Sequence, residues 1–276
     1  MSGAVRKAAV AGTWYPGSAS RIRREVESYL SAVAPVVPPG RLVGLVSPHA
    51  GLMYSGPVAA HGYSLLRGTK DLVAVVVGPS HRVPFEGLAV YAHGCFETPL
   101  GRAPIDEDLA ARLLSAHTFL VDLPQPHRGE HSLEMQLPFL QHLVPGLRLV
   151  PILMAHQGEE EVMALAGALS EALAGRDDVV LVASSDLSHY YPAAIANELD
   201  AQVVGDVRDF DVGGLLARLV RAPGHACGGG PVVAVMMAAR RLGANQTLVL
   251  RYADSGDVGE RDKSRVVGYL SAALFA

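Results

Sequence analysis

The chain has 276 residues, of which 50% are hydrophobic and 18% charged, and its formal net charge is −4 at pH 7. This composition supplies a sizeable apolar core and excludes a disordered chain, and the lack of a basic excess argues against nucleic acid as the main ligand. Two cysteines cannot form a disulfide scaffold. We find no signal-peptide pattern and no apolar run of about 18 residues, so we expect a cytoplasmic protein without a membrane span.

Short apolar runs rich in β-branched residues recur along the chain and predict strands. In order they are Leu42–Val46, Leu72–Val77, Leu147–Leu153, Val179–Ala183, Leu248–Tyr252 and Val266–Leu270. The first four of these runs are almost wholly apolar, which suits strands buried on both faces, as in a parallel or mixed sheet covered by helices. The segment Gly87–Pro99 alternates loosely and predicts a hairpin at the sheet edge.

Helical patterns occupy most of the intervals between these runs. They cover Ser20–Val33, Gly56–Leu66, Asp106–Ala116, Glu130–Leu143, Glu159–Leu173, Ile195–Val207, Val212–Val220 and Pro231–Leu242. We find neither a linker-like stretch nor an internal repeat. The sequence therefore predicts one α/β domain over residues 1–276, a three-layer sandwich with a mostly parallel or mixed central sheet covered by helices.

Three predicted strands each run into a loop that carries a histidine. His49 follows the first strand, His81 follows the second, and Asp186 and His189 follow Val179–Ala183. Ligands of open α/β sheets bind beyond the carboxyl ends of the strands, so we expect these loops to converge. A single histidine beside glycine or proline is usually an ordinary loop residue, but three at strand ends favour a site.

Cys227 lies in a glycine-rich loop just before the helix predicted to begin at Pro231. A helix N-terminus lowers the pKa of a nearby thiol and favours the thiolate, which binds metals or attacks electrophiles. The loop is equally compatible with a flexible turn. Cys95 falls within an apparent strand and is expected to be structural.

Glu130 and Glu134 are four residues apart, so the predicted helix places them on one face, with His131 offset from both. This pattern is compatible with acidic helix capping alone, or with Glu130 and His131 on the wall of a cavity. It is not the zinc-protease motif, and we find no phosphate-binding loop, dinucleotide fingerprint or hydrolase elbow.

Two imidazoles and a thiolate form a three-ligand metal site that leaves positions open for water, substrate or dioxygen. Two histidines and a third ligand resemble the non-haem iron pattern, and sulfur ligation also admits zinc or copper. His189 is then placed to act as an acid/base, and Asp186 to orient a neighbouring group. The metal stays open at this point.

Seven ordered strings resemble the Memo family, whose bacterial and archaeal members are often named AmmeMemoRadiSam system protein B. They are AGTWYPG, SPHAGLMYSGPVAAH, GPSHRVP, FETPLG, EHSLEMQLPFL, SSDLSHY and CGGGPV. The resemblance implies a fold similar to class III extradiol dioxygenases, which are non-haem iron enzymes. It also implies metal ligands at His49, His81 and Cys227, an active-site pair of Asp186 and His189, and a pocket lined by Glu130 and His131.

The resemblance leaves two functions open. One is an iron-dependent redox enzyme; the other is a non-catalytic protein that binds copper, a peptide or a small ligand on the same fold. The dioxygenases have a carboxylate where this chain has Cys227, so ring-opening activity is not inherited. The naming of the bacterial relatives implies AMMECR1-like and radical-SAM partner proteins.

Overall fold

The apolar runs form the middle of a mixed β-sheet in a computed structural model that describes residues 4–258 and 262–276. All six predicted strands are present in it. Within the described residues the main sheet has, in spatial order, β10 (His189–Tyr191), β12 (Val266–Phe275), β2 (Leu42–Ser47), β9 (Val179–Ser184), β3 (Val73–Pro79), β8 (Arg148–Met154), β4 (Leu88–Val90) and β7 (Leu120–Asp122), with β11 (Gln246–Asp254) also paired to β12.

The centre of this sheet is parallel and its flanks are mixed. Strands β2, β9, β3 and β8 run parallel, whereas β12 pairs antiparallel with β2, and β4 pairs antiparallel with β8. Every residue of β3 and β9 is buried, as expected for strands covered on both faces. The predicted α/β class with a mixed sheet is therefore confirmed.

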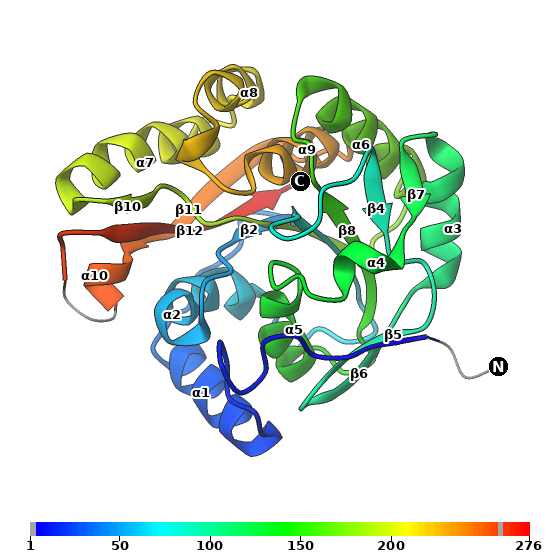
Figure 1. The fold of residues 1–276 in the computed structure, drawn as a ribbon, viewed down its shortest axis with the longest axis horizontal. Coiled ribbons are helices and arrows are strands. Elements are labelled where there is room, and N and C mark those ends of the chain that lie inside the picture. Colours follow the sequence, from blue (N-terminus) through cyan, green and yellow to red (C-terminus); the bar gives the residue numbers. More distant parts are fainter. Residues whose placement is uncertain (1–3, 259–261) are drawn as a thin grey trace.

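Helices cover both faces of the sheet (Figure 1). One layer contains α1 (Ala19–Ser31), α2 (Leu52–Tyr63) and α5 (Leu137–Leu143). The other contains α6 (Glu159–Ala172), α7 (Ala193–Arg208), α8 (Val212–Arg221) and α9 (Gly229–Arg241), with α3 (Glu107–Ala116) packed on α6. Helix α1 buries only Ile22, Val26 and Leu30, which recur every four residues, whereas α9 is buried almost throughout because it lies between the sheet and its neighbouring helices.

The parallel strands end together, and this places the candidate site. Ser47 of β2 pairs with Ser184 of β9, and Val77 of β3 pairs with Ala183. Each candidate site residue lies two positions after the end of a strand: His49 after β2, His81 after β3 and Asp186 after β9.

The predicted hairpin over Gly87–Pro99 is wrong. Its first half is β4 of the main sheet, whereas its second half, β5 (Cys95–Thr98), belongs to a three-stranded sheet with β1 (Val5–Arg6) and β6 (Gly101–Pro104). The turn that joins antiparallel neighbours lies later, between Thr98 and Gly101, which pair across β5 and β6. Alternation of polar and apolar residues indicates a strand but does not identify its partner.

The predicted helix over Glu130–Leu143 is also wrong in its first half. A 3-10 turn, η2 (Glu134–Gln136), precedes α5, and residues 129–133 are not helical. Pro138 has no N–H to donate to residue 134 and suits the first turn of a helix instead. Glu130 and Glu134 consequently do not share a helix face. Helix α2 also begins four residues before the predicted Gly56.

The remaining short elements are α4 (Pro124–His127), α10 (Ser255–Val258), η1 (Ser64–Leu66) and η3 (Pro223–His225). Across the described ranges, 4–258 and 262–276, the helices are too short or too polar to traverse a lipid bilayer.

Candidate metal centre

Three imidazoles meet at the carboxyl edge of the sheet. The ring centroids of His49 and His81 are 5.2 Å apart, those of His49 and His131 are 5.5 Å apart, and those of His81 and His131 are 4.5 Å apart. One potential ligand atom from each ring lies within 4.8 Å of the other two. The expected convergence of the His49 and His81 loops is thus observed, and His131 joins them from the segment before η2.

His81 is held by the carboxylate of Glu130. Its Nδ1 lies 2.9 Å from Glu130 Oε1, and its backbone N–H donates to Oε2 at 2.6 Å. Glu130 Oε1 also accepts the N–H groups of His131 and Ser132, both at 2.9 Å. Burial alone would raise the pKa of Glu130, but the hydrogen bond and electrostatic interaction with the His81 ring, and the N–H groups of Ser132 and His81, lower it to about 2. A carboxylate only accepts, so His81 donates from Nδ1 and leaves Nε2 as a free ligand atom.

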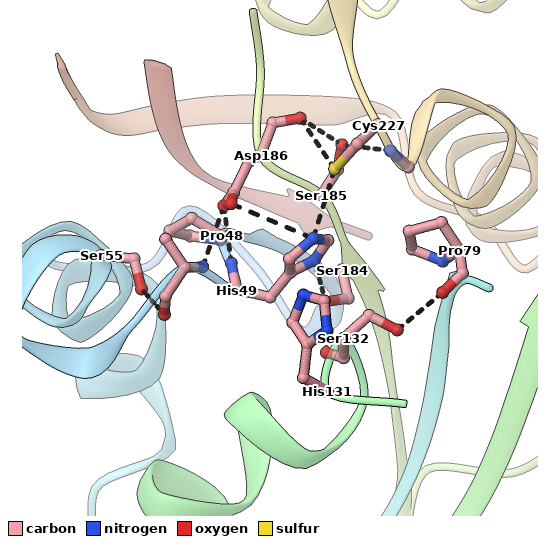
Figure 2. Close-up of polar contacts among 12 residues, drawn as sticks. Pro48, His49, Ser55, Pro79, His131, Ser132, Ser184, Ser185, Asp186 and Cys227 are labelled. Atoms are coloured by element: carbon pink, nitrogen blue, oxygen red, sulfur yellow. Dashed lines mark hydrogen bonds and ion pairs between the residues drawn. The ribbon is translucent and has the colours of Figure 1, made fainter. Parts of the chain in front are cut away.

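His49 is buried and lies between Ser184 and Cys227 (Figure 2). Its Nδ1 lies 2.9 Å from Ser184 Oγ, and its Nε2 lies 3.2 Å from Cys227 Sγ. Burial, followed by repulsion from His131 and His81, lowers the pKa of His49 well below 6.5. A ring that stays neutral at pH 7 has a lone pair to offer a metal ion.

Asp186 positions the loop that carries His49. Its Oδ1 accepts the backbone N–H groups of His49 at 2.7 Å and Ala50 at 3.3 Å, while its Oδ2 lies 4.0 Å from His49 Nε2. Its backbone carbonyl accepts the N–H of Cys227 at 3.1 Å, which ties the β9 loop to the cysteine loop. Burial raises the pKa of Asp186, so its carboxylate is a costly charge that these donors stabilise.

His189 begins β10 and lines the same cavity. Its Nδ1 lies 2.8 Å from the carbonyl oxygen of Leu187, which only accepts. Nδ1 therefore carries the hydrogen, and Nε2 remains free to take up a proton. The next residue, Tyr190, has φ of 65°, a left-handed conformation that is uncommon outside glycine.

Cys227 lies against the end of β9 because Gly228 permits a close backbone approach. A Cβ on Gly228 would lie 2.3 Å from the carbonyl oxygen of Ser184, and the Gly228 N–H donates to Ser185 Oγ at 2.9 Å. Burial, followed by the charge of Asp186, raises the pKa of the Cys227 thiol. The net direction is therefore opposite to the lowering expected at the N-terminus of α9, because burial disfavours the charged thiolate.

A cavity of about 690 Å³ opens beside the cluster. Five of the predicted site residues line it, namely His49, His81, His131, Asp186 and His189, whereas Glu130 and Cys227 are not among its lining residues. Aromatic side chains form much of the remaining wall: Trp14, Tyr54, Tyr190 and Tyr269. The wall thus combines apolar and polar side chains, the polar ones including Asp262 and Arg265 besides the histidines and Asp186. Concave sites with converging polar groups are typical of small-molecule binding.

Sequence reasoning did not identify three residues of this site. The ring of Trp14 packs on His131 with centroids 4.3 Å apart, and the carbonyl of Trp14 accepts the N–H of Leu52 at the start of α2. Ser184 and Gln136 contact each other behind His49, with Gln136 Nε2 2.8 Å from Ser184 Oγ. All three residues occur in the family strings AGTWYPG, EHSLEMQLPFL and SSDLSHY, but nothing in the chemistry of those strings marks them as site residues.

Comparison with known proteins agrees with the sequence resemblance. Residues 6–273 match a family model described as Memo-like protein. A MEMO1 family protein of Ignicoccus hospitalis is 40% identical over 278 residues and 96% of each chain. Another, from Methanothermobacter thermautotrophicus, is 37% identical over 275 residues, which cover 96% of this chain and 98% of the relative. The chain belongs to the Memo family.

Proposed function

We propose that this Memo family protein binds one metal ion between His49, His81 and Cys227, with His131 as a further donor, and uses it in redox chemistry on a small molecule. The observation that carries the proposal is the convergence of three imidazoles whose ligand atoms lie within 4.8 Å of one another beside an open cavity. Imidazole and thiolate are the side chains that bind iron, copper and zinc.

The donor set fits a metal ion in three respects. Two ligands of one ion, each about 2.0–2.3 Å from it, lie roughly 3–4 Å apart, and Cys227 Sγ is 3.2 Å from His49 Nε2. Glu130 holds Nδ1 of His81, the usual outer partner of a metal-binding histidine. Nδ1 of His131 is buried and makes no hydrogen bond, although it lies 3.3 Å from Glu130 Oε1, and a bound ligand would give it a partner.

The cavity determines what this chain can do around such an ion. When bound, the ion would supply Lewis-acid or one-electron chemistry, with iron favoured and copper or zinc as alternatives. His189 lines the cavity, and its Nε2, which takes no part in the hydrogen bond to Leu187, would accept or return a proton of the bound molecule. Asp186 would keep the His49 loop in place, and the aromatic wall would bury the apolar part of the ligand. The likeness to class III extradiol dioxygenases stays a prediction.

A non-catalytic metal-binding role is the second candidate. The sulfur of Cys227 beside His49 Nε2 favours it, because a soft thiolate raises affinity for Cu(I). The same pocket could then hold a small ligand or peptide. Association with AMMECR1-like and radical-SAM proteins is proposed on family resemblance alone.

Metal analysis of protein purified without oxygen or chelator tests the site. We expect near-stoichiometric metal in the wild-type chain and its loss in His49→Ala and Cys227→Ser, whereas His117→Asn, which changes an exposed histidine outside the cavity, retains it. Retention of full metal by both site variants would refute the ligand set. Oxygen uptake by the iron-loaded protein with a panel of catechols or thiols supports the redox role; tight copper binding without turnover supports the second candidate.

A further inference from the structure

We infer that Gln136 and Ser184 are positioning residues that fix the hydrogen of neutral His49 on Nδ1 and so present the Nε2 lone pair to a metal ion. The role of this arrangement in metal binding rests on the proposed metal site, but the position of the hydrogen on His49 depends only on groups of the protein. It follows from the donor and acceptor capacities of groups that are linked by one series of hydrogen bonds behind His49.

The series of hydrogen bonds starts at the carboxamide of Gln136, which is fully buried. Its Nε2 end lies 3.1 Å from the carbonyl oxygen of Pro48 and 2.8 Å from Ser184 Oγ, and its Oε1 end accepts the hydroxyl of Tyr63 at 2.7 Å. A backbone carbonyl can only accept, so the end that faces Pro48 must be the NH₂ group. That NH₂ group therefore also donates to Ser184.

The next group is the hydroxyl of Ser184, which donates its single hydrogen to a backbone carbonyl. Its Oγ lies 2.7 Å from the carbonyl oxygen of Ser132, which accepts and cannot donate (Figure 2). The hydroxyl hydrogen therefore points to Ser132, and one lone pair of Oγ accepts from Gln136. One lone pair of Ser184 remains.

The remaining lone pair faces His49 Nδ1 at 2.9 Å. Since Ser184 has no second hydrogen to give, Nδ1 must be the donor, and a neutral ring then carries its lone pair on Nε2. Nε2 is the atom that lies 3.2 Å from Cys227 Sγ. His49 thus reaches the arrangement that Glu130 imposes on His81, but through neutral buried groups instead of a carboxylate.

Ring nitrogen shifts and metal affinity test the inference together. In chelator-treated protein at neutral pH, with ¹⁵N in the histidine rings, we expect His49 to carry its hydrogen on Nδ1. In Ser184→Ala the hydrogen should move toward Nε2, because Nδ1–H would be a buried donor without an acceptor. Metal affinity should then fall about 10- to 100-fold, as for other outer-shell partners of metal ligands.

Two further variants complete the design. Gln136→Met should shift the ring in the same direction with a smaller loss of affinity, and it carries the test if Ser184→Ala does not fold. Ser271→Ala, also at a fully buried serine but on β12, should change neither readout.

The outcomes separate this inference from the proposed function. A wild-type His49 with its hydrogen on Nε2, or a Ser184→Ala protein with unchanged ring shifts and affinity, would overturn the inference even if the protein binds metal. A wild-type ring with its hydrogen on Nδ1 that moves in Ser184→Ala would support the inference, and failure of that wild-type protein to take up any metal would then count against the proposed function alone.

Discussion

Loss of charge at Glu134 should destabilise the protein far more than loss of a surface ion pair. Glu134 pairs with Arg6, and the side chains of the two are 0% and 1% exposed. Arg6 also donates to the carbonyl oxygens of His127, at 2.9 Å, and Glu130. Glu134 in turn accepts the backbone N–H groups of residues 9 and 10 and the hydroxyl of Tyr15. The pair therefore ties the N-terminal segment to the loop that carries His131.

The magnitude follows from this burial. Glu134→Gln keeps the size of the side chain but leaves the Arg6 guanidinium buried without a counter-charge, which costs about 3–5 kcal/mol. Lys7→Met is the matched control, because Lys7 pairs with Glu97 while 71% of its side chain is exposed. Exposed pairs contribute about 0–1 kcal/mol. The expected difference between the destabilisation caused by Glu134→Gln and that caused by Lys7→Met is a substantial part of a typical unfolding free energy of about 5–15 kcal/mol.

Urea unfolding followed by circular dichroism and by fluorescence provides the assay. The chain has one tryptophan, Trp14, whose ring packs on His131, so its emission reports on the site itself. The double variant Arg6→Met with Glu134→Met should regain part of the loss, since no charge is then left unpaired. If Glu134→Gln unfolds with the same free energy as Lys7→Met, the argument from burial fails.

Three further predictions concern Gly228, the buried His127 and Cys227. Gly228→Ala should lower the free energy of unfolding by about 1–3 kcal/mol and weaken metal binding, because its Cβ would lie 2.3 Å from the Ser184 carbonyl oxygen. Gly224→Ala on the same loop is the control: its Cβ would meet open space, so its thermal unfolding should match that of the wild type. Burial lowers the pKa of His127 from 6.5 to about 3, so below pH 6.5 the unfolded chain takes up a proton that the folded chain refuses. Stability should fall as pH drops below 6.5, with a slope for this group that approaches about 1.4 kcal/mol per pH unit near pH 5. His127→Asn should have a shallower slope between pH 6.5 and 5, and an equal slope would contradict this. Cys227→Ser should keep the urea midpoint of the wild type but lose metal affinity in a competition titration, because a hydroxyl is a much weaker ligand than a thiolate.

The sequence was sufficient to predict the sheet and the edge where the site lies. Apolar β-branched runs identify buried strands because the hydrophobicity and strand preference of a segment depend on its own residues. The strand ends then predict that His49, His81 and Asp186 meet, since parallel strands present their carboxyl ends at one edge. His189 was likewise identified from the strand that precedes it and Cys227 from its glycine-rich loop, and their roles as acid/base and ligand remain predictions.

Only the tertiary structure decided how these residues are supported. Gly87–Pro99 alternates like a hairpin but contributes to two different sheets, and the segment before Pro138 is not helical. The ion pair of Arg6 with Glu134 joins residues 128 positions apart, and Ser184 contacts Gln136 across 48 positions. Local periodicity reveals which face of an element is buried, but it carries no information about which distant donor meets which acceptor. Which donor meets which acceptor depends on the packing of the whole chain. The same packing determines the position of His131 and the orientation of the His49 ring.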